Sequence, residues 1–444
     1  MQWETPGVVC ARHALTAEGW QQDVAIRISG GVITAIEPAP AGAKAFDLLL
    51  PGMANVHSHA FQRAMVGLTE FASAEGKDNF WSWREVMYHF LETLTPEDVE
   101  RVARQFYIEL LEQGYTAVGE FHYLHNDSKG RPYADPAELS HRIIAAATAA
   151  GIHLTHLPVM YETANFGGIP AQEGQRRFVH TADSYLKLLE SLQKNYRDTA
   201  DVSLGVAPHS LRAVTPETLK KIFEALPGLG LAAAPRHIHA AEQEKEVADC
   251  LAWSGRRPVQ WLLETQAVDS HWCLIHATHM TPQETAGLAA SGAVAGLCPT
   301  TEANLGDGIF PAEAYAQDGG RMAIGSDSNV CTSPWEELRL MEYAQRLTLK
   351  KRNVLAGAYG ASVGRSLFER AARGGAQALA LPAGQIAVGL RADLVAVAQN
   401  SPWLVDKSGD AILNTLIFGS PPAVTDVFVS GRHVVREGRH VARG

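Results

Sequence analysis

Two histidines one residue apart follow an apolar run over residues 48–56. Because side chains at i and i+2 of an extended strand point to the same side, His57 and His59 can aim two imidazole nitrogens at one point. Two such nitrogens begin the ligand set of a tetrahedral metal site. The spacing alone is weak evidence for a metal site, since two surface histidines in a turn would have the same spacing. The preceding apolar run favours the end of a buried strand.

Further residues able to do chemistry follow other apolar runs. They are Glu120 to Tyr123, His209 to Arg212, His237 to Glu242, His276, and Ser326 to Ser328. A random scatter of histidines would not favour the same end of each run. The joint pattern therefore predicts one shared site.

The elements that position these residues alternate between strands and helices. The strand candidates are 48–56, 115–121, 152–159, 202–208, 234–240, 271–277, 293–298 and 321–326. Several intervening helices open with a hydroxyl residue followed by proline, as at Thr95, Thr215, Thr281 and Ser333. Eight strands alternating with helices over 51–380 predict an α/β fold, a (β/α)₈ TIM barrel whose site lies at the carboxyl ends of the strands. A doubly wound open sheet is the runner-up, but no Gly-x-Gly-x-x-Gly follows the first strand.

Both ends of the chain are rich in β-type residues. Residues 24–28 and 32–36 flank Gly30-Gly31, which is typical of a hairpin, and 392–397 and 424–429 also read as strands. Since each end alone is too small to fold well, we expect 1–50 and 381–444 to form one small β-sandwich domain. The aromatic insertion at 60–94 is long enough to be a lid or a subunit contact, and a homodimer is expected.

Composition excludes several classes of protein. The net charge of −10 and the lack of a basic run argue against a nucleic-acid-binding surface. No uncharged apolar stretch of about 18 residues predicts a membrane span, and the first residues lack signal-peptide features. Five scattered cysteines fit reduced thiols in a cytoplasm.

Taken together, His-x-His, His-Ala-Ala-Glu at 239–242, His276 and Ser-Asp at 326–327 resemble the metal-dependent amidohydrolase superfamily. Longer stretches, 57–63, 81–88 and 298–308, resemble the formimidoylglutamate deiminase (N-formimino-L-glutamate iminohydrolase) family. That resemblance implies hydrolysis of N-formimino-L-glutamate to N-formyl-L-glutamate and ammonia, in histidine degradation, by a metal-activated water.

The resemblance also implies a ligand set of His57, His59, His239 and Asp327. This set suits zinc, although iron or manganese would also fit. His237 is a rival to His239 on the same strand, but the motif places the ligand directly before Ala-Ala-Glu, which leaves His237 structural. Neither 202–209 nor 151–160 contains a lysine that could bridge two metals, so one ion per chain is expected.

The resemblance further implies that His276 and Asp327 orient the attacking water and take its proton, and that Glu242 carries the proton to the leaving nitrogen. Taken singly, Glu242 could be a helix N-terminal carboxylate and His276 a core histidine. Only the motif context favours the catalytic roles.

A substrate with two carboxylates needs cations and hydrogen-bond donors. The candidates are Arg84, His209, Arg212, Gln62 and Tyr123. Arg84 could act in its own or in a neighbouring subunit. The roles of Thr332 and Ser333 stay open, because Ser333 is explained as a helix cap.

Two alternatives remain at this stage. One is an aminohydrolase of a nucleobase or related heterocycle with the same metal site, and the other is a non-catalytic barrel scaffold. The sequence also leaves open whether N-formimino-L-aspartate is a substrate.

Overall fold

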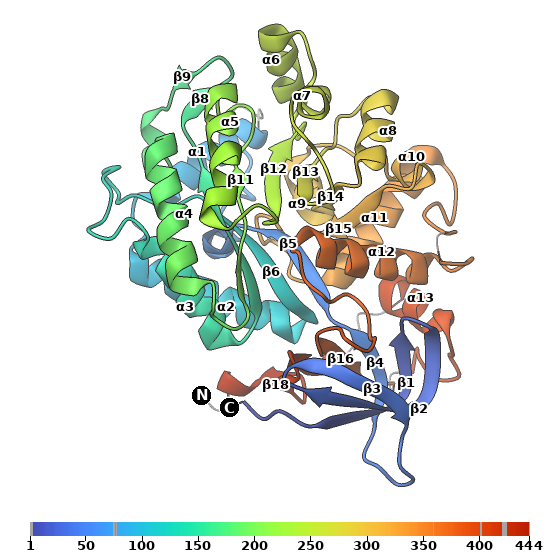
Figure 1. The fold of residues 1–444 in the computed structure, drawn as a ribbon. Helices are drawn as coiled ribbons and strands as arrows, with labels where there is room; N and C mark the ends of the chain where they lie inside the picture. Colours follow the sequence, from blue (N-terminus) through green and yellow to red (C-terminus); the bar gives the residue numbers. More distant parts are fainter. Residues whose placement is uncertain are drawn as a thin grey trace.

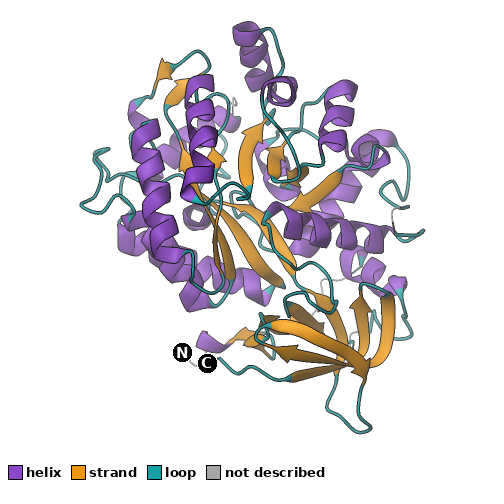
Figure 2. Cartoon of the chain, in the orientation of Figure 1, coloured by secondary structure: helices purple, strands orange, loops and turns teal. Residues whose placement is uncertain are grey.

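A barrel of strands surrounded by helices occupies most of the molecule, and a separate sheet lies beside it (Figures 1 and 2). The computed structural model describes residues 3–73, 76, 78–357, 359–399, 402–419 and 424–443. The predicted ranges 1–50, 60–94 and 381–444 each include a few residues outside this set.

The barrel is a closed ring of parallel strands. In chain order they are β5 (Met53–Ser58), β6 (Tyr115–His122), β7 (His153–Met160), β10 (Val202–Leu204) with β11 (Ala207–Pro208), β12 (Arg236–Ala240), β13 (Trp272–His276), β14 (Val294–Leu297) and β15 (Arg321–Ile324). Hydrogen bonding divides them into a β10-β7-β6-β5 sheet, with β11 on β7, and a β12-β13-β14-β15 sheet. Parallel bridges from Val206 to Arg236 and from Ser58 to Asp327 join the two sheets. The predicted (β/α)₈ barrel is confirmed, and the open sheet is excluded.

Helices connect successive barrel strands or follow the last one, and they lie around the outside of the barrel (Figure 2). They are α2 (Pro96–Glu112), α3 (Glu138–Ala150), α4 (Ala182–Tyr196), α5 (Pro216–Ala225), α6 (Glu244–Ser254), α7 (Pro258–Thr265), α8 (Pro282–Ser291), α9 (Pro299–Leu305), α10 (Ala312–Gln317), α11 (Pro334–Leu349), α12 (Val363–Ala378) and α13 (Asp410–Phe418). The side chains of Thr95, Thr215 and Thr281 each accept a hydrogen bond from the backbone N–H three residues later, as expected of N-caps.

Ser333 does not act as its sequence predicts. It precedes α11, but its side chain makes no capping hydrogen bond. Its backbone N–H donates to Sγ of Cys331 at 3.4 Å. The prediction of a Ser333 side-chain cap is therefore wrong.

The first predicted strand, 48–56, divides at Gly52. Residues up to Pro51 form β4 (Phe46–Pro51) in the separate sheet, and β5 begins the barrel. A Cβ atom on Gly52 would lie 2.3 Å from Oγ1 of Thr116, so only glycine allows this close approach of β5 to β6. The expectation of one continuous strand is corrected to two.

The separate sheet contains both ends of the chain, as predicted. Its described strands are β1 (Val8–Thr16), β2 (Gly19–Ser29), β3 (Val32–Pro38), β4, β16 (Leu394–Val397), β17 (Val424–Val429), β18 (Arg432–Arg436) and β19 (Arg439–His440). Their order is β19-β18-β17-β16-β4-β1-β2-β3, so β4 from the first part of the chain pairs with β16 from the last, with Leu50 opposite Val395. The blue and red strands of Figure 1 therefore share one sheet, which has its own apolar cluster.

Between β5 and α2, the insertion forms η1 (Ala60–Met65) and α1 (Phe80–Leu91). Short elements elsewhere are β8 (Thr163–Asn165), β9 (Ile169–Pro170), η2 (Glu173–Gln175), η3 (Leu226–Leu229) and η4 (Val441–Arg443). Among the described helices, none combines the length and the apolar character that crossing a membrane requires.

Candidate metal centre and active site

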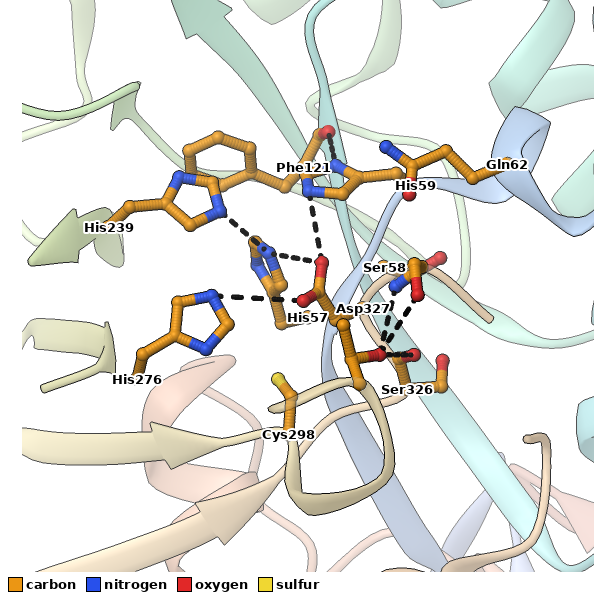
Figure 3. Close-up of polar contacts among 12 residues, drawn as sticks. His57, Ser58, His59, Gln62, Phe121, His239, His276, Cys298, Ser326 and Asp327 are labelled. Atoms are coloured by element: carbon orange, nitrogen blue, oxygen red, sulfur yellow. Dashed lines mark hydrogen bonds and ion pairs between the residues drawn. The ribbon is translucent and has the colours of Figure 1, made fainter. Parts of the chain in front are cut away.

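Four side chains from three ends of barrel strands meet at one point (Figure 3). They are His57, His59, His239 and Asp327, and their ligand atoms all lie within 4.8 Å of one another. Nε2 of His57 lies 3.0 Å from Nε2 of His239 and 3.5 Å from Oδ1 of Asp327. Nε2 of His59 is 3.3 Å from that same oxygen. Ligands about 2.0–2.1 Å from a tetrahedral zinc ion are separated by about 3.3 Å, so these spacings fit such an ion.

The orientation of the rings fits a cation as well. Nδ1 of His59 donates to the carbonyl of Phe121 at 2.9 Å, and Nδ1 of His239 donates to the carbonyl of His209 at 3.0 Å. With the proton on Nδ1, each Nε2 presents a lone pair to the centre. Burial lowers the pKa of His57 to about 3 and that of His239 well below its usual value, so the rings of His57 and His239 are neutral. Lone pairs this close together repel unless a cation lies between them.

Asp327 is held in a strained position after β15. Its φ of +47° is left-handed, a conformation that a residue other than glycine keeps only where its surroundings enforce it. Gly325 allows this approach, because a Cβ there would lie 2.9 Å from His57 Cβ. Although burial alone would raise the pKa of Asp327, contacts with His57 and His59 hold it well below its usual range. The carboxylate is therefore ionised.

His276 and Glu242 flank this centre. Nε2 of His276 lies 3.7 Å from Oδ2 of Asp327 and 3.9 Å from Oε1 of Glu242. Burial works to lower the pKa of His276, but Glu242, Glu302 and Asp327 together raise it to about 10. Burial raises the pKa of Glu242, with Arg212 and His276 opposing. The carboxyl group of Glu242 and the ring of His276 are therefore neighbours, and the His276 ring also lies next to Asp327.

A narrow pocket of about 60 Å³ opens onto the centre. Its lining includes all five residues predicted to bind substrate, namely Gln62, Arg84, Tyr123, His209 and Arg212. Nε2 of Gln62 donates to the Tyr123 hydroxyl at 2.6 Å. Arg212 is buried, 3.6 Å from Glu242 and 3.8 Å from Glu246. The pocket therefore combines a metal centre with two guanidinium groups.

Arg84 enters this pocket from α1 of the same chain. Its guanidinium carbon lies 4.5 Å from the ring centroid of Trp81 and 5.5 Å from that of Tyr88. Its Nε is buried with no hydrogen-bond partner. A cation stacked on aromatic rings and short of acceptors is available to an anion.

A model of the "Amidohydrolase family" matches residues 48–434. The chain belongs to the amidohydrolase family. A second model, "Formimidoylglutamate deiminase HutF, N-terminal domain", matches residues 7–47. The resemblance inferred from the motifs is thereby confirmed.

Individual relatives of this amidohydrolase agree with the family models. It is 54% identical over 437 residues to a formimidoylglutamate deiminase of Pseudomonas aeruginosa, covering 97% of this chain and 95% of that one. It is 29% identical to a 5-methylthioadenosine/S-adenosylhomocysteine deaminase of Halobacterium salinarum, covering 86% and 81%. Among solved structures, an amidohydrolase of Brucella melitensis superposes with a TM-score of 0.92 at 49% identity, covering 99% and 96%.

Other predicted residues of the amidohydrolase lie elsewhere. His237 donates from Nε2 to the carbonyl of Ala378 at the end of α12, 2.8 Å away, and so does not reach the centre. Neither Thr332 nor Ser333 is in the pocket lining. His122 lies on β6 with its ring next to His125 and His156, apart from the four ligand candidates.

Three carboxylates around the site were not predicted. Glu246 accepts from the backbone N–H of Glu242 at 3.2 Å and faces Arg212. Glu302 accepts from Nδ1 of His276 at 3.2 Å and from the backbone N–H of Cys298 at 2.9 Å. Asp307 bonds to Gln243, and burial and Glu242 raise its pKa to about 9. Glu302 and Asp307 fall within the 298–308 stretch singled out by resemblance, which was the available signal.

A second group could also hold an ion. His276, Cys298 and Asp327 offer ligand atoms within 4.8 Å of one another, and they share Asp327 with the first group. An ion there would compete with any role of His276 in proton transfer.

Proposed function

We propose that this chain hydrolyses N-formimino-L-glutamate to N-formyl-L-glutamate and ammonia, in histidine degradation. As a member of the amidohydrolase family, it is a hydrolase that acts on a C–N bond other than a peptide bond, which sets aside the scaffold alternative. The observation that carries the proposal is the placement of Arg84 and Arg212 in one pocket with the four converging ligand candidates.

We propose that His57, His59, His239 and Asp327 hold one zinc ion, with iron or manganese as substitutes. Three imidazoles and a carboxylate match a catalytic zinc site with a position left for water. When bound, such an ion lowers the pKa of water from 15.7 towards about 7, which supplies a nucleophile at neutral pH.

The side chains around the ion then handle protons. The charge of a bound cation opposes the carboxylates that raise the pKa of His276, so that a neutral His276, with Asp327, would orient the attacking water and accept its proton. The water oxygen bonds to the formimino carbon, and Glu242 carries the proton to the imino nitrogen. A second proton then moves from the added hydroxyl group to the same nitrogen, the C–N bond to that nitrogen breaks, ammonia leaves, and the hydroxyl oxygen remains as the formyl oxygen. The raised pKa of Glu242 suits a group that must take up and release a proton.

The remaining pocket residues hold the glutamate part of the substrate. We assign one carboxylate to Arg212 with His209 and the other to Arg84, since the planar guanidinium matches a carboxylate. Gln62 and Tyr123, already bonded to each other, supply a further amide and hydroxyl. The buried and unpaired Oε1 of Gln62 is an acceptor for a substrate N–H.

We further propose a homodimer in the cytoplasm, with the β-domain formed by 1–50 and 381–444 and the barrel by 51–380. Support for a dimer comes from the insertion, where Val66, Leu68, Phe71 and Val86 expose apolar side chains, Phe71 to 78%. Support for the cytoplasm comes from the five free cysteines.

The test is ammonia release by the zinc-loaded protein. N-formimino-L-glutamate should be turned over, whereas adenine, guanine, cytosine and S-adenosylhomocysteine should not. The heterocycle alternative rests on the relative in Halobacterium salinarum, and the two arginines that line the pocket argue against it. Turnover of a heterocycle without turnover of the formimino compound would overturn the proposal.

A further inference from the structure

A second hollow lies at the opposite end of β15 from Asp327. It has a volume of about 600 Å³, ten times that of the catalytic pocket. Its polar lining comes from the first residue of β15, from α12 and from the segments on either side of α12. These polar residues are Arg321, Tyr359, Arg370, Arg373, Gln377 and Gln385. We call this feature the arginine hollow.

The arginine hollow carries more positive than negative charge. Of its three guanidinium groups, Arg373 pairs with Glu369 at 2.9 Å, and Glu369 is shared with Arg365 at 3.2 Å. Arg321 bonds to the neutral amide of Gln377. Gathering three arginines around one hollow is notable in a chain whose net charge is −10.

Arg370 is the arginine of the hollow that lacks a counter-ion among the described residues. Its Nε is buried and has no hydrogen-bond acceptor, and no carboxylate among the described residues pairs with its guanidinium. A buried donor without an acceptor costs about 1–3 kcal/mol, and more for a charged group. Arg370 also lines the hollow, and no described carboxylate neutralises its charge, so its guanidinium is available to an anionic ligand there.

The chemistry of that ligand follows from the donors. Guanidinium groups present planar pairs of N–H donors that match the oxygens of carboxylates and phosphates. The Tyr359 ring lies 5.2 Å from the Arg373 guanidinium carbon and stacks against it, which limits the positions of that cation. Gln385 adds an amide to the lining.

We propose that the arginine hollow binds a multiply charged oxyanion, a polycarboxylate or a phosphate compound, at a site separate from the catalytic pocket. The anion bridges Arg370, Arg321 and Arg373, and so ties the start of β15 to α12. Because the anion binds the folded chain, it raises the melting temperature.

The experiment titrates the metal-loaded protein with pyrophosphate and, separately, with citrate, at constant ionic strength. Calorimetry should show saturable binding of one anion per chain, and the melting temperature should rise with it. The tighter of the two anions identifies the phosphate or the carboxylate class. Arg370→Gln and, independently, Arg321→Gln should each weaken binding at least tenfold while turnover stays at the wild-type level.

Arg101→Gln is the matched control, because Arg101 on α2 is 72% exposed and lies outside the hollow. Its affinity for the anion should equal that of the wild type. The proposal is overturned when neither anion binds saturably, or when both hollow variants bind as tightly as the wild type. It is also overturned when the anion raises KM as a competitor of substrate, since it then occupies the Arg84 and Arg212 pocket.

Discussion

The barrel contains two groups of buried histidines. In the first, His57, His59 and His239 converge with Asp327. In the second, His122, His125, His156 and His180 have ring centroids 5.8, 5.7 and 4.3 Å apart for the pairs 122–125, 122–156 and 125–180. Phe121 packs against the first group, and His122, next in β6, points to the other side of the strand.

The groups differ in what surrounds their nitrogens. In the first, carbonyl groups fix the protons on two rings and a carboxylate completes the set. In the second, both nitrogens of His122 and both of His156 lack hydrogen-bond partners, and no described carboxylate forms an ion pair with any of the four. Burial and residue type are therefore not sufficient for a metal site, because aimed lone pairs and a counter-charge are also needed.

Removing one ring from each group should give the largest difference between the two groups. His239→Ala should lose the metal and reduce turnover by more than about 10⁴-fold, because the activated water and several kcal/mol of charge stabilisation are lost together. His156→Ala should keep one metal ion per chain and keep turnover. Metal analysis and ammonia release measure both. Loss of metal from folded His156→Ala would show that the second group also binds an ion.

A substitution of Glu242 tests whether the carboxylate beside the first group takes part in proton transfer or only supports the structure. Glu242→Gln should lower kcat by about 10²- to 10⁴-fold with metal retained, because a proton carrier is removed while the ligands are intact. Glu244→Gln is the matched control, since Glu244 is exposed at the start of α6. Near-wild-type turnover by zinc-loaded Glu242→Gln would remove Glu242 from the mechanism.

A substitution of Arg212 tests its proposed role in substrate binding. Arg212→Met should reduce kcat/KM for N-formimino-L-glutamate by about 30-fold or more, since losing one partner of a buried charge pair costs about 2–5 kcal/mol. Metal content should not change. Arg101→Met, at an exposed position, provides the control. Metal loss in Arg212→Met would instead mean that the contacts of Arg212 with Glu242 and Glu246 support the centre structurally.

Sequence could predict the barrel and the convergence of the first group, because apolar runs that end in histidines and alternate with helices leave few topologies. It could not exclude His122 from the site, since His122 also lies at the end of a strand, and only the side of β6 to which its ring points separates it from Phe121. Gly52 shows a second limit. A glycine inside an apolar run does not reveal that the chain changes sheets there, because the reason is the position of Thr116, 64 residues later.

The carboxylates that sequence missed have a similar explanation. Glu302 reaches His276 only because β13 and β14 are neighbours in the barrel, with Ile275 opposite Gly296. Glu246 resembles an ordinary acidic residue in the first turn of α6 until Arg212 is placed beside it. Such contacts depend on strand register, which spacing along the chain does not contain.

The smallest expected effect is a loss of stability at acid pH that the histidines of the second group cause. Burial lowers the pKa of His122 to about 3 and of His180 to about 4, and that of His156 well below its usual 6.5. Below pH 6.5 the unfolded chain therefore binds protons that the folded chain does not. Above pH 6.5 these histidines make their full contribution to the free energy of unfolding. As the pH drops towards their pKa values in the folded chain, this contribution falls by up to about 1.4 kcal/mol per pH unit for each histidine.

His156→Leu should remove one of these protons. In urea titrations between pH 7 and pH 5, the average loss of unfolding free energy per pH unit should be smaller by about 1 kcal/mol than in the wild type, because the full slope is reached only well below pH 6.5. Acid also displaces metal from the first group, but both proteins share that effect, so the difference in slope reports His156 alone. Equal slopes would mean that the His156 ring takes up a proton while folded, and the second group would then be a hydrated, chargeable cluster rather than a set of neutral packed rings.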